Sequence, residues 1–253
     1  MKPDAMSAVC DGHVHVGGHA QWYFPPVYVV GAMRRLGVRR WAVSSMSTTP
    51  AGFTAARKEL ETVLQLAAGQ AVPVLWVSPA MLRQSPDLSR FDALPYRAIK
   101  VHGFDGWTPF GKPLQRLFAI AMERELPVVM HTGGASHCNA GAFERICLAF
   151  PTVKVVLCHG RPAEEAAHVQ AHCPNVWIET SFMQVRDIRK VISRNGSDRI
   201  LFGTDFPMDE VWFPNQSAVG RYRRRVHALT KAFGKGEFLR WSMHSFRTIY
   251  NTE

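Results

Sequence analysis

Three kinds of protein are disfavoured by what this sequence lacks. No apolar run reaches the roughly 18–20 residues that a bilayer-spanning helix requires, so we expect no membrane anchor. The first residues do not combine a basic region with a long apolar stretch, so we expect no secretory signal. No Gly-x-Gly-x-x-Gly motif follows the first apolar run, which removes the main sign of a dinucleotide-binding fold.

Cysteine is scarce, and its placement argues against a disulfide framework. The five cysteines include no Cys-x-x-Cys pair, and Cys10 and Cys158 lie inside apolar runs that are typical of buried strands. An odd number of cysteines placed in this way favours a reduced protein. We therefore expect a cytoplasmic location.

Acidic residues are outnumbered: 20 Asp and Glu face 30 Lys and Arg, which gives a net charge of +10. Such a charge can steer small anions toward the protein or attract nucleic acid without specificity. The densest basic run, Arg221–Arg225, lies in a predicted helix and is interpreted as a solvated face or a partner contact. No nucleic-acid-binding motif accompanies it. We expect a small-molecule substrate, with an anionic one favoured, and no specific nucleic-acid or membrane partner, while a homo-oligomer stays open.

Short apolar runs recur along the chain and predict eight strands. They are continuous rather than alternating, as expected for strands that are covered on both faces. The predicted strands are Ala8–Val16, Arg40–Ser45, Val72–Val77, Ala98–His102, Pro127–His131, Lys154–His159, Val176–Thr180 and Arg199–Gly203.

Helix-length segments separate most of these strands and predict an α/β fold. The predicted helices are Val27–Leu36, Ala55–Ala68, Lys112–Glu125, Asn139–Phe150, Ala163–His172 and Val185–Asn195. Eight strand–helix repeats favour a closed (β/α)₈ TIM barrel over an open parallel sheet. No Pro-, Ser- or Gly-rich linker divides the chain, so we expect one barrel domain over residues 1–253. Residues 211–253 form its predicted C-terminal helical closure.

Polar side chains stand at the C-terminal ends of four predicted strands. The first strand ends on His13 and His15, the fifth on His131 and the sixth on His159, and Asp205 follows the eighth. Residues two apart on a strand point to the same face, so His13 and His15 both project into the barrel. Barrels of this type build their active sites at this end. Unpaired polar groups crowded there would be costly to desolvate, so a shared metal ion is the better interpretation.

Four segments carry a resemblance to a known family. The sequences Asp11–His15, Val128–His131, Cys158–Pro162 and Ile200–Pro207 resemble the amidohydrolase superfamily, and within it the amidohydrolase-related branch of metal-dependent hydrolases. The likeness runs from Asp11 to the last predicted helix. The resemblance implies that the metal is held by four residues, with His159 beside it as a catalytic residue or a further ligand. Those four are His13, His15, His131 and Asp205.

Three histidines and one carboxylate suit Zn²⁺, although Mn²⁺ and Fe²⁺ also fit. One metal ion is favoured over two. Some superfamily members bridge two ions with a carboxylated lysine or a glutamate, and Lys100 near the end of the fourth strand is the candidate for such a bridge. No strand end resembles the glutamate-bearing one of the TatD-type nucleases, which disfavours a nuclease.

The favoured function is hydrolysis of an amide, ester or lactone bond in a small molecule by a metal-activated water. Asp205 would act as the general base, and His159 would stabilise the developing oxyanion or assist proton transfer. The alternative is a metal-dependent, non-oxidative decarboxylase of an aromatic or unsaturated carboxylic acid. A non-catalytic binding barrel is less favoured, because the ligand set is complete.

Five further residues are candidate substrate contacts: Lys100, His102, Arg161, Trp22 and Trp107. Each also has a structural interpretation, as a rim residue, an ion pair or a loop anchor. His168 and His172 lie four apart on a predicted helix, a spacing that can hold a metal ion. With no partner carboxylate or cysteine pair identified for them, they are interpreted as a solvated helix face.

Overall fold

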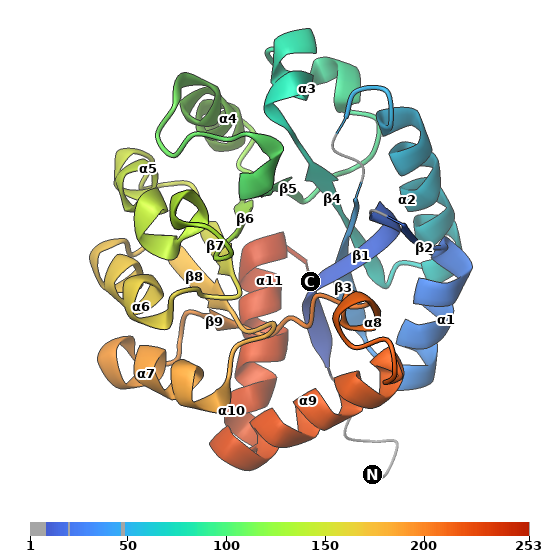
Figure 1. The fold of residues 1–253 in the computed structure, drawn as a ribbon, viewed down its shortest axis with the longest axis vertical. Helices are drawn as coiled ribbons and strands as arrows, with labels where there is room; N and C mark the ends of the chain where they lie inside the picture. Colours follow the sequence, from blue (N-terminus) through green and yellow to red (C-terminus); the bar gives the residue numbers. More distant parts are fainter. Residues whose placement is uncertain (1–8, 20, 47–48, 253) are drawn as a thin grey trace.

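The computed structural model describes residues 9–19, 21–46 and 49–252. Eight parallel strands pair with one another in chain order, which confirms the predicted barrel fold (Figure 1). The strands are β1 (Cys10–His19), β3 (Arg40–Ser45), β4 (Ala71–Trp76), β5 (Ala98–Val101), β6 (Val128–His131), β7 (Val155–Cys158), β8 (Val176–Glu179) and β9 (Ile200–Leu201).

Backbone hydrogen bonds between β1 and the segment that follows β9 close the barrel. Gly12 N donates to Phe202 O at 2.9 Å, and His15 N donates to Phe206 O at 2.7 Å. Between these two bonds, Asp205 N donates to His13 O at 2.9 Å. The segment after β9 is thus hydrogen-bonded to β1 at the end of the barrel where the polar side chains lie.

Helices surround the strands as predicted, with small changes at their ends. They are α1 (Pro26–Leu36), α2 (Phe53–Ala67), α3 (Pro79–Gln84), α4 (Lys112–Glu123), α5 (Glu144–Ala149), α6 (Ala163–His172) and α7 (Val185–Asn195). The predicted helix Asn139–Phe150 is a 3₁₀ turn, Ala140–Phe143, followed by α5. The predicted loop at Trp22 contains β2 (Trp22–Phe24), a short strand antiparallel to β1. No helix in the described residues is both long and apolar enough to span a membrane.

Helix α1 shows how local sequence sets these boundaries. Pro26 begins the helix, where a missing N–H costs nothing, and Gly37 ends it in a left-handed conformation with φ of 68°. The buried residues Val29, Val30, Met33 and Leu36 recur at helical spacing and face the strands. The same pattern of one apolar face per helix builds the outer core.

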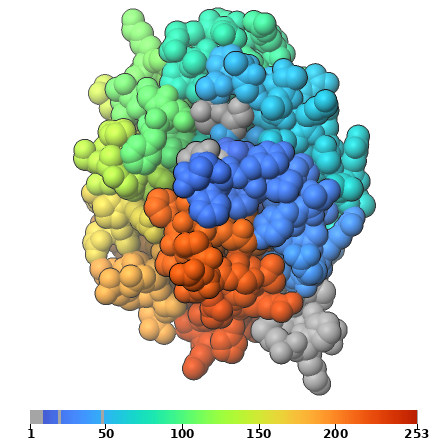
Figure 2. All heavy atoms as spheres, turned by 45° about the vertical axis from the view of Figure 1, so that its right-hand side comes forward, coloured from blue at the N-terminus to red at the C-terminus, as the bar shows by residue number. Residues whose placement is uncertain are grey.

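The C-terminal segment comprises α8 (Asp209–Trp212), α9 (Ala218–Phe233), α10 (Lys235–Leu239) and α11 (Ser245–Tyr250). Helix α9 lies in the outer ring, in contact with α1 and α7, and Figure 2 shows the orange C-terminal segment beside the blue N-terminal one. Helix α11 lies against β1 and β9 instead (Figure 1).

Helix α11 packs into the inside of the barrel. Its Phe246, Ile249 and Tyr250 belong to one apolar cluster with inward-facing strand residues such as Val74 and Val129. The hydroxyl of Tyr250 donates to Gly12 O at 2.6 Å. One end of the barrel is therefore filled by this helix, which leaves the other end for chemistry.

Candidate metal centre

Three side chains converge at the open end of the barrel. The Nε2 atoms of His13 and His15 lie 3.0 Å apart. Asp205 Oδ1 lies 3.2 Å from Nε2 of His13 and 2.9 Å from Nε2 of His15. All three residues are buried. The predicted meeting of the β1 histidines with the residue after β9 is therefore present in the structure.

This geometry fits a metal ion. Metal–ligand bonds of about 2.0–2.1 Å in a tetrahedral site place the ligand atoms roughly 3.3 Å from one another, close to the spacing of these three atoms. Two imidazole lone pairs that face each other also need a proton or a cation between them. Two histidines and one carboxylate with open positions are a donor set that suits Zn²⁺ and related ions.

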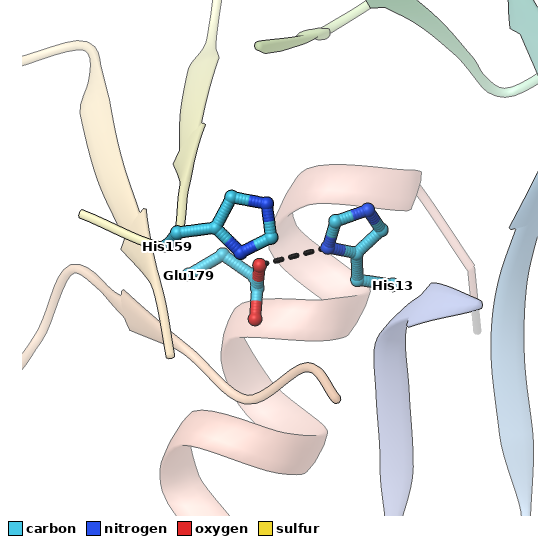
Figure 3. Close-up of side chains that lie close together, drawn as sticks. All are labelled: His13, His159 and Glu179. Atoms are coloured by element: carbon cyan, nitrogen blue, oxygen red, sulfur yellow. Dashed lines mark hydrogen bonds and ion pairs between the residues drawn. The ribbon is translucent and has the colours of Figure 1, made fainter. Parts of the chain in front are cut away.

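The outer nitrogens of both histidines have partners that fix the rings. His13 Nδ1 lies 2.9 Å from Oε2 of Glu179, and a carboxylate oxygen can only accept a hydrogen bond (Figure 3). His15 Nδ1 lies 3.0 Å from the Ser44 hydroxyl. A carboxylate behind a histidine holds the proton on Nδ1, so Nε2 of His13 keeps its lone pair for a cation.

Glu179 is a residue that the sequence analysis missed. It ends β8 and is fully buried, at a strand end to which the sequence analysis assigned no role. Glu179 also forms a group with His13 and His159 whose ligand atoms lie within 4.8 Å of one another. Gly203 makes room for it, because a Cβ there would lie 2.5 Å from Oε1 of Glu179. Its position at a predicted strand end was the available signal.

His159 and His131 lie beside the three converging ligands. Nε2 of His159 lies 3.1 Å from Nδ1 of His131, and the Ser181 hydroxyl lies 2.7 Å from Nδ1 of His159. The His131 ring packs on His102, with ring centroids 4.0 Å apart. His131 belongs to neither of the two metal-ligand groups at this end of the barrel. The structure thus places His13, His15 and Asp205 together, with His159 next to them and His131 one contact further away.

Lys100 lies in the wall of the site, beside His13 and Cys158. Its Nζ is 2.9 Å from Nε2 of His13 and 3.4 Å from Sγ of Cys158, and the residue is 2% exposed. The ammonium group therefore donates to the same lone pair that a cation would use. A proton on Lys100 and a cation at His13 compete for one nitrogen.

Burial controls the protonation of the imidazoles. It lowers the pKa of His131 to about 4 and that of His102 to about 2, and it holds the pKa of His13 and His159 well below the ordinary value. Neutral histidines are the form that binds metal ions. Burial alone would raise the pKa of Asp205, but the surrounding imidazoles outweigh it and hold that pKa well below its ordinary value.

Two residues at the site have strained backbones. Asp205 has φ of 61° and His159 has φ of 68°, a region that non-glycine residues rarely adopt. Asp11 supports the first of these turns, because its carboxylate accepts hydrogen bonds from the Thr204 backbone N–H at 3.1 Å and the Thr204 hydroxyl at 2.6 Å. Such strain persists where the surroundings over-determine a conformation, as at a functional site.

A cavity of about 650 Å³ lies over these groups. Its wall includes the predicted contacts Lys100, His102 and Arg161. Trp107 is buried elsewhere, and Trp22 lines a separate shallow pocket with Glu210, so the positions of their side chains do not support the expected substrate contacts. The loops after the strands supply wall residues that the sequence analysis did not find: Met46, Phe104, Phe182, Met208, Trp212 and Phe213. Trp76 at the end of β4 was missed as well.

The rim of this cavity is apolar. Trp212 is 64% exposed, Phe104 is 56% exposed and Phe213 is 38% exposed. Large exposed aromatic side chains around a polar floor are typical of a binding site for a small organic molecule. Loop residues of this kind have no regular spacing, which is why the strand pattern did not reveal them.

Comparison with known proteins identifies the class. The sequence model of the amidohydrolase family matches residues 10–233, so the chain belongs to that family. No curated protein matches the sequence. The family is metal-dependent, in agreement with the donor set at the open end of the barrel.

Proteins with solved structures of similar fold are named for different reactions. A zinc-bound amidohydrolase from Burkholderia multivorans is 12% identical, with a TM-score of 0.70 over 97% of this chain and 99% of that one. A 5-carboxyvanillate decarboxylase from Sphingomonas paucimobilis is 13% identical, with a TM-score of 0.66 over 97% and 99%. A 4-oxalomesaconate hydratase from Rhodopseudomonas palustris is 14% identical, with a TM-score of 0.65 over 96% and 95%. At these identities the likeness establishes the fold alone.

Proposed function

We propose that the protein is a metal-dependent hydrolase that cleaves an amide, ester or lactone bond in a small molecule. The observation that carries this proposal is the convergence of His13, His15 and Asp205 on one point at the floor of an aromatic-rimmed cavity. His13, His15 and Asp205 would hold one divalent ion, with Zn²⁺ favoured and Mn²⁺ or Fe²⁺ as alternatives. His159, His131 or Glu179 are the candidates for a further ligand.

When bound there, a divalent ion polarises a carbonyl group and makes a water molecule more acidic. Asp205 is the proposed general base. Both of its contacts to the histidines use Oδ1, which leaves the other oxygen of the carboxylate to accept a proton. Its lowered pKa keeps it ionised at neutral pH, which is the form in which it can accept a proton.

His159 is the proposed partner of the developing oxyanion. The Ser181 hydroxyl and His131 contact its two ring nitrogens, which fixes the ring next to His13. Donation to the oxyanion would require Nε2 to exchange its contact with Nδ1 of His131 for the substrate oxygen, while the Ser181 hydroxyl keeps Nδ1 in place. Lys100 and Arg161 add positive charge to the same cavity, which favours an anionic substrate.

A decarboxylase is the second candidate. The similar decarboxylase from S. paucimobilis is covered over 99% of its length, so the length of this chain is compatible with either reaction. A carboxylate placed between the metal ligands and Arg161 would suit either reaction.

The two reactions are separated by their products. The zinc-loaded protein is incubated with lactones, amides and aromatic acids in ¹⁸O-labelled water, and ¹⁸O in the product is measured together with released CO₂. We expect label incorporation and no CO₂, whereas CO₂ without label would establish the decarboxylase. No turnover of any substrate by metal-loaded protein would contradict both.

Asp205→Asn is the matched variant for this experiment. We expect it to lose at least about 10²-fold in turnover, because general-base catalysis typically contributes that much. Zinc content is measured in the same sample, so loss of the base is distinguished from loss of the metal. Undiminished turnover at full zinc content would remove Asp205 from the base role.

A further inference from the structure

A second cavity of about 300 Å³ adjoins the one over the metal centre. Arg161, Phe182 and Phe213 belong to the walls of both, so these three side chains form the partition between them. The second cavity carries two more arginines, Arg221 and Arg225. The two cavities therefore lie side by side, with Arg161 in the wall that they share.

The two arginines come from the basic run Arg221–Arg225, which the sequence analysis interpreted as a solvated face or a partner contact. Arg221 and Arg225 are four residues apart on α9, so they share one face of the helix. Arg223 and Arg224 in the same run are exposed. The run is thus divided between a face that lines the cavity and a solvated face.

Positive charge exceeds negative charge among the residues that line this cavity. Asp209 is its one acidic residue among the described residues, and it lies 3.0 Å from Nε of Arg221. Arg225 donates to Thr180 O, while its buried Nε has no hydrogen-bond partner in the described structure. Burial lowers the pKa of Arg225 to about 10, so the group stays charged at neutral pH. A buried cation is costly unless an anion or hydrogen-bond acceptors compensate it.

We propose that Arg161, Arg221 and Arg225 bind an oxyanion, a carboxylate or a phosphate, at one end of a substrate whose other end lies at the metal centre. The planar guanidinium group matches both oxyanions with paired hydrogen bonds. The inference rests on the proposed function and narrows its substrate class to small molecules with a second, non-reacting anionic group. Arg225 and Arg221 are the specificity-determining residues.

Binding without turnover tests this arrangement. Linear dicarboxylates from succinate to suberate, each paired with its neutral-ended monoamide, are titrated into the zinc-loaded protein by calorimetry, and ω-phosphono acids of the same lengths distinguish phosphate from carboxylate. We expect at least one chain length to bind about tenfold tighter than its monoamide, as a charge-assisted hydrogen bond provides. That gain should fall in Arg221→Gln and Arg225→Gln.

Arg223→Gln is the matched control, because it removes the same charge from the exposed side of α9. It should keep the gain. Thermal unfolding verifies that each variant is folded, and Arg221→Gln carries the test if Arg225→Gln is not. The proposal is overturned if no dianion binds better than its monoamide, or if the gain survives in the Arg221→Gln variant and the Arg225→Gln variant alike. Since no turnover is needed, a failure of the proposed reaction leaves this result unaffected.

A separate group of ligands lies outside the barrel mouth. The sequence analysis identified no partner carboxylate for His168 and His172, but α5 supplies one. Oε1 of Glu144 lies 3.3 Å from Nε2 of His168 and 2.8 Å from Nδ1 of His172. The ligand atoms of all three lie within 4.8 Å of one another. The side chains are between 29% and 51% exposed, so an ion can reach them from solvent.

We infer that this group binds a second divalent transition-metal ion, which would link α5 to α6. Two imidazoles and one carboxylate with open positions suit Zn²⁺ or Cu²⁺. An ion that binds only the folded chain stabilises it in proportion to the logarithm of its concentration. This site is independent of the reaction at the barrel mouth.

Zinc titration followed by calorimetry and thermal unfolding tests the second ion. We expect one more bound zinc per chain in the native protein than in His168→Gln or His172→Gln, and a zinc-dependent rise in melting temperature that these variants lose. His227→Gln removes another exposed histidine from α9 and should change neither quantity. Equal zinc stoichiometry in the native protein and both variants would overturn the inference.

Discussion

The two halves of the barrel interior use the same strands for opposite purposes. In the lower half, the end of the barrel that α11 fills, Val74 and Val129 pack with Phe246 in a cluster of buried apolar side chains. The upper half is the end that carries the metal centre. Two positions further along the same strands, the inward side chains are Trp76 and His131, and both line the cavity over the metal centre. The comparison shows that inward residues only two positions apart on a strand can have different roles: one stabilises the fold and the next lines the cavity.

The largest effect should come from breaking the lower half. Phe246→Ala removes a fully buried ring from α11, the helix that fills one end of the barrel. We expect a loss of about 3–5 kcal/mol in the free energy of unfolding. Urea denaturation measures this loss. Zinc affinity of the remaining folded protein should change little, because the metal ligands are not in this cluster. A variant that keeps its stability would show that α11 does not fill the barrel.

Glu179→Gln tests the upper half with a nearly isosteric change. We expect zinc affinity to fall by about 10–100-fold, because the carboxylate that holds the proton on His13 Nδ1 is lost. The free energy of unfolding of the metal-free protein should change far less than it does in Phe246→Ala. Competition with a chromophoric chelator measures the affinity, and unchanged zinc binding would contradict the assigned role of Glu179.

Acid should affect the upper half selectively. The unfolded chain protonates the imidazole of His131 near pH 6.5, but the folded protein does so only near pH 4. The stability that depends on the neutral imidazole is therefore fully present above pH 6.5 and is lost as the pH falls toward 4. At pH 5 the metal-free protein should lose about 2 kcal/mol through this residue. Denaturation at pH 7.5 and pH 5 measures the loss, which His131→Asn should reduce.

Lys100→Met should have the smallest effect and would sharpen the metal count. Removal of the ammonium group beside His13 should raise zinc affinity by about three- to tenfold, with the same number of zinc ions per chain. Lys58→Met removes an exposed charge and serves as the control. If Lys100→Met instead lowers the zinc content by one ion, Lys100 is a metal bridge and the site holds two ions.

Much of the fold could be predicted because buried parallel strands appear as short apolar runs. All eight predicted strands occur, and β1 and the segment after β9 carry the histidines and the aspartate that meet. The boundaries of helices such as α1 follow from proline and glycine near their ends. These signals are local, so one sequence contains them.

The parts that could not be predicted depend on contacts between distant segments. Glu179 has importance only because His13, 166 residues away in the chain, turns its Nδ1 toward it. The aromatic rim comes from loops whose sequences have no period. The insertion of α11 into the barrel also has no local signal, since its apolar residues would suit the outer ring equally well.

Strand periodicity and strand polarity are properties of neighbouring residues, so they were enough to predict a parallel α/β barrel with histidines and an aspartate at its strand ends. The folded arrangement fixed which of these groups share one point in space and which lie one contact away. It also decided that Arg221 and Arg225 face a cavity beside Arg161. The physical reason is that distances across a closed barrel are set by the packing of every strand and helix together, and no single segment contains that information.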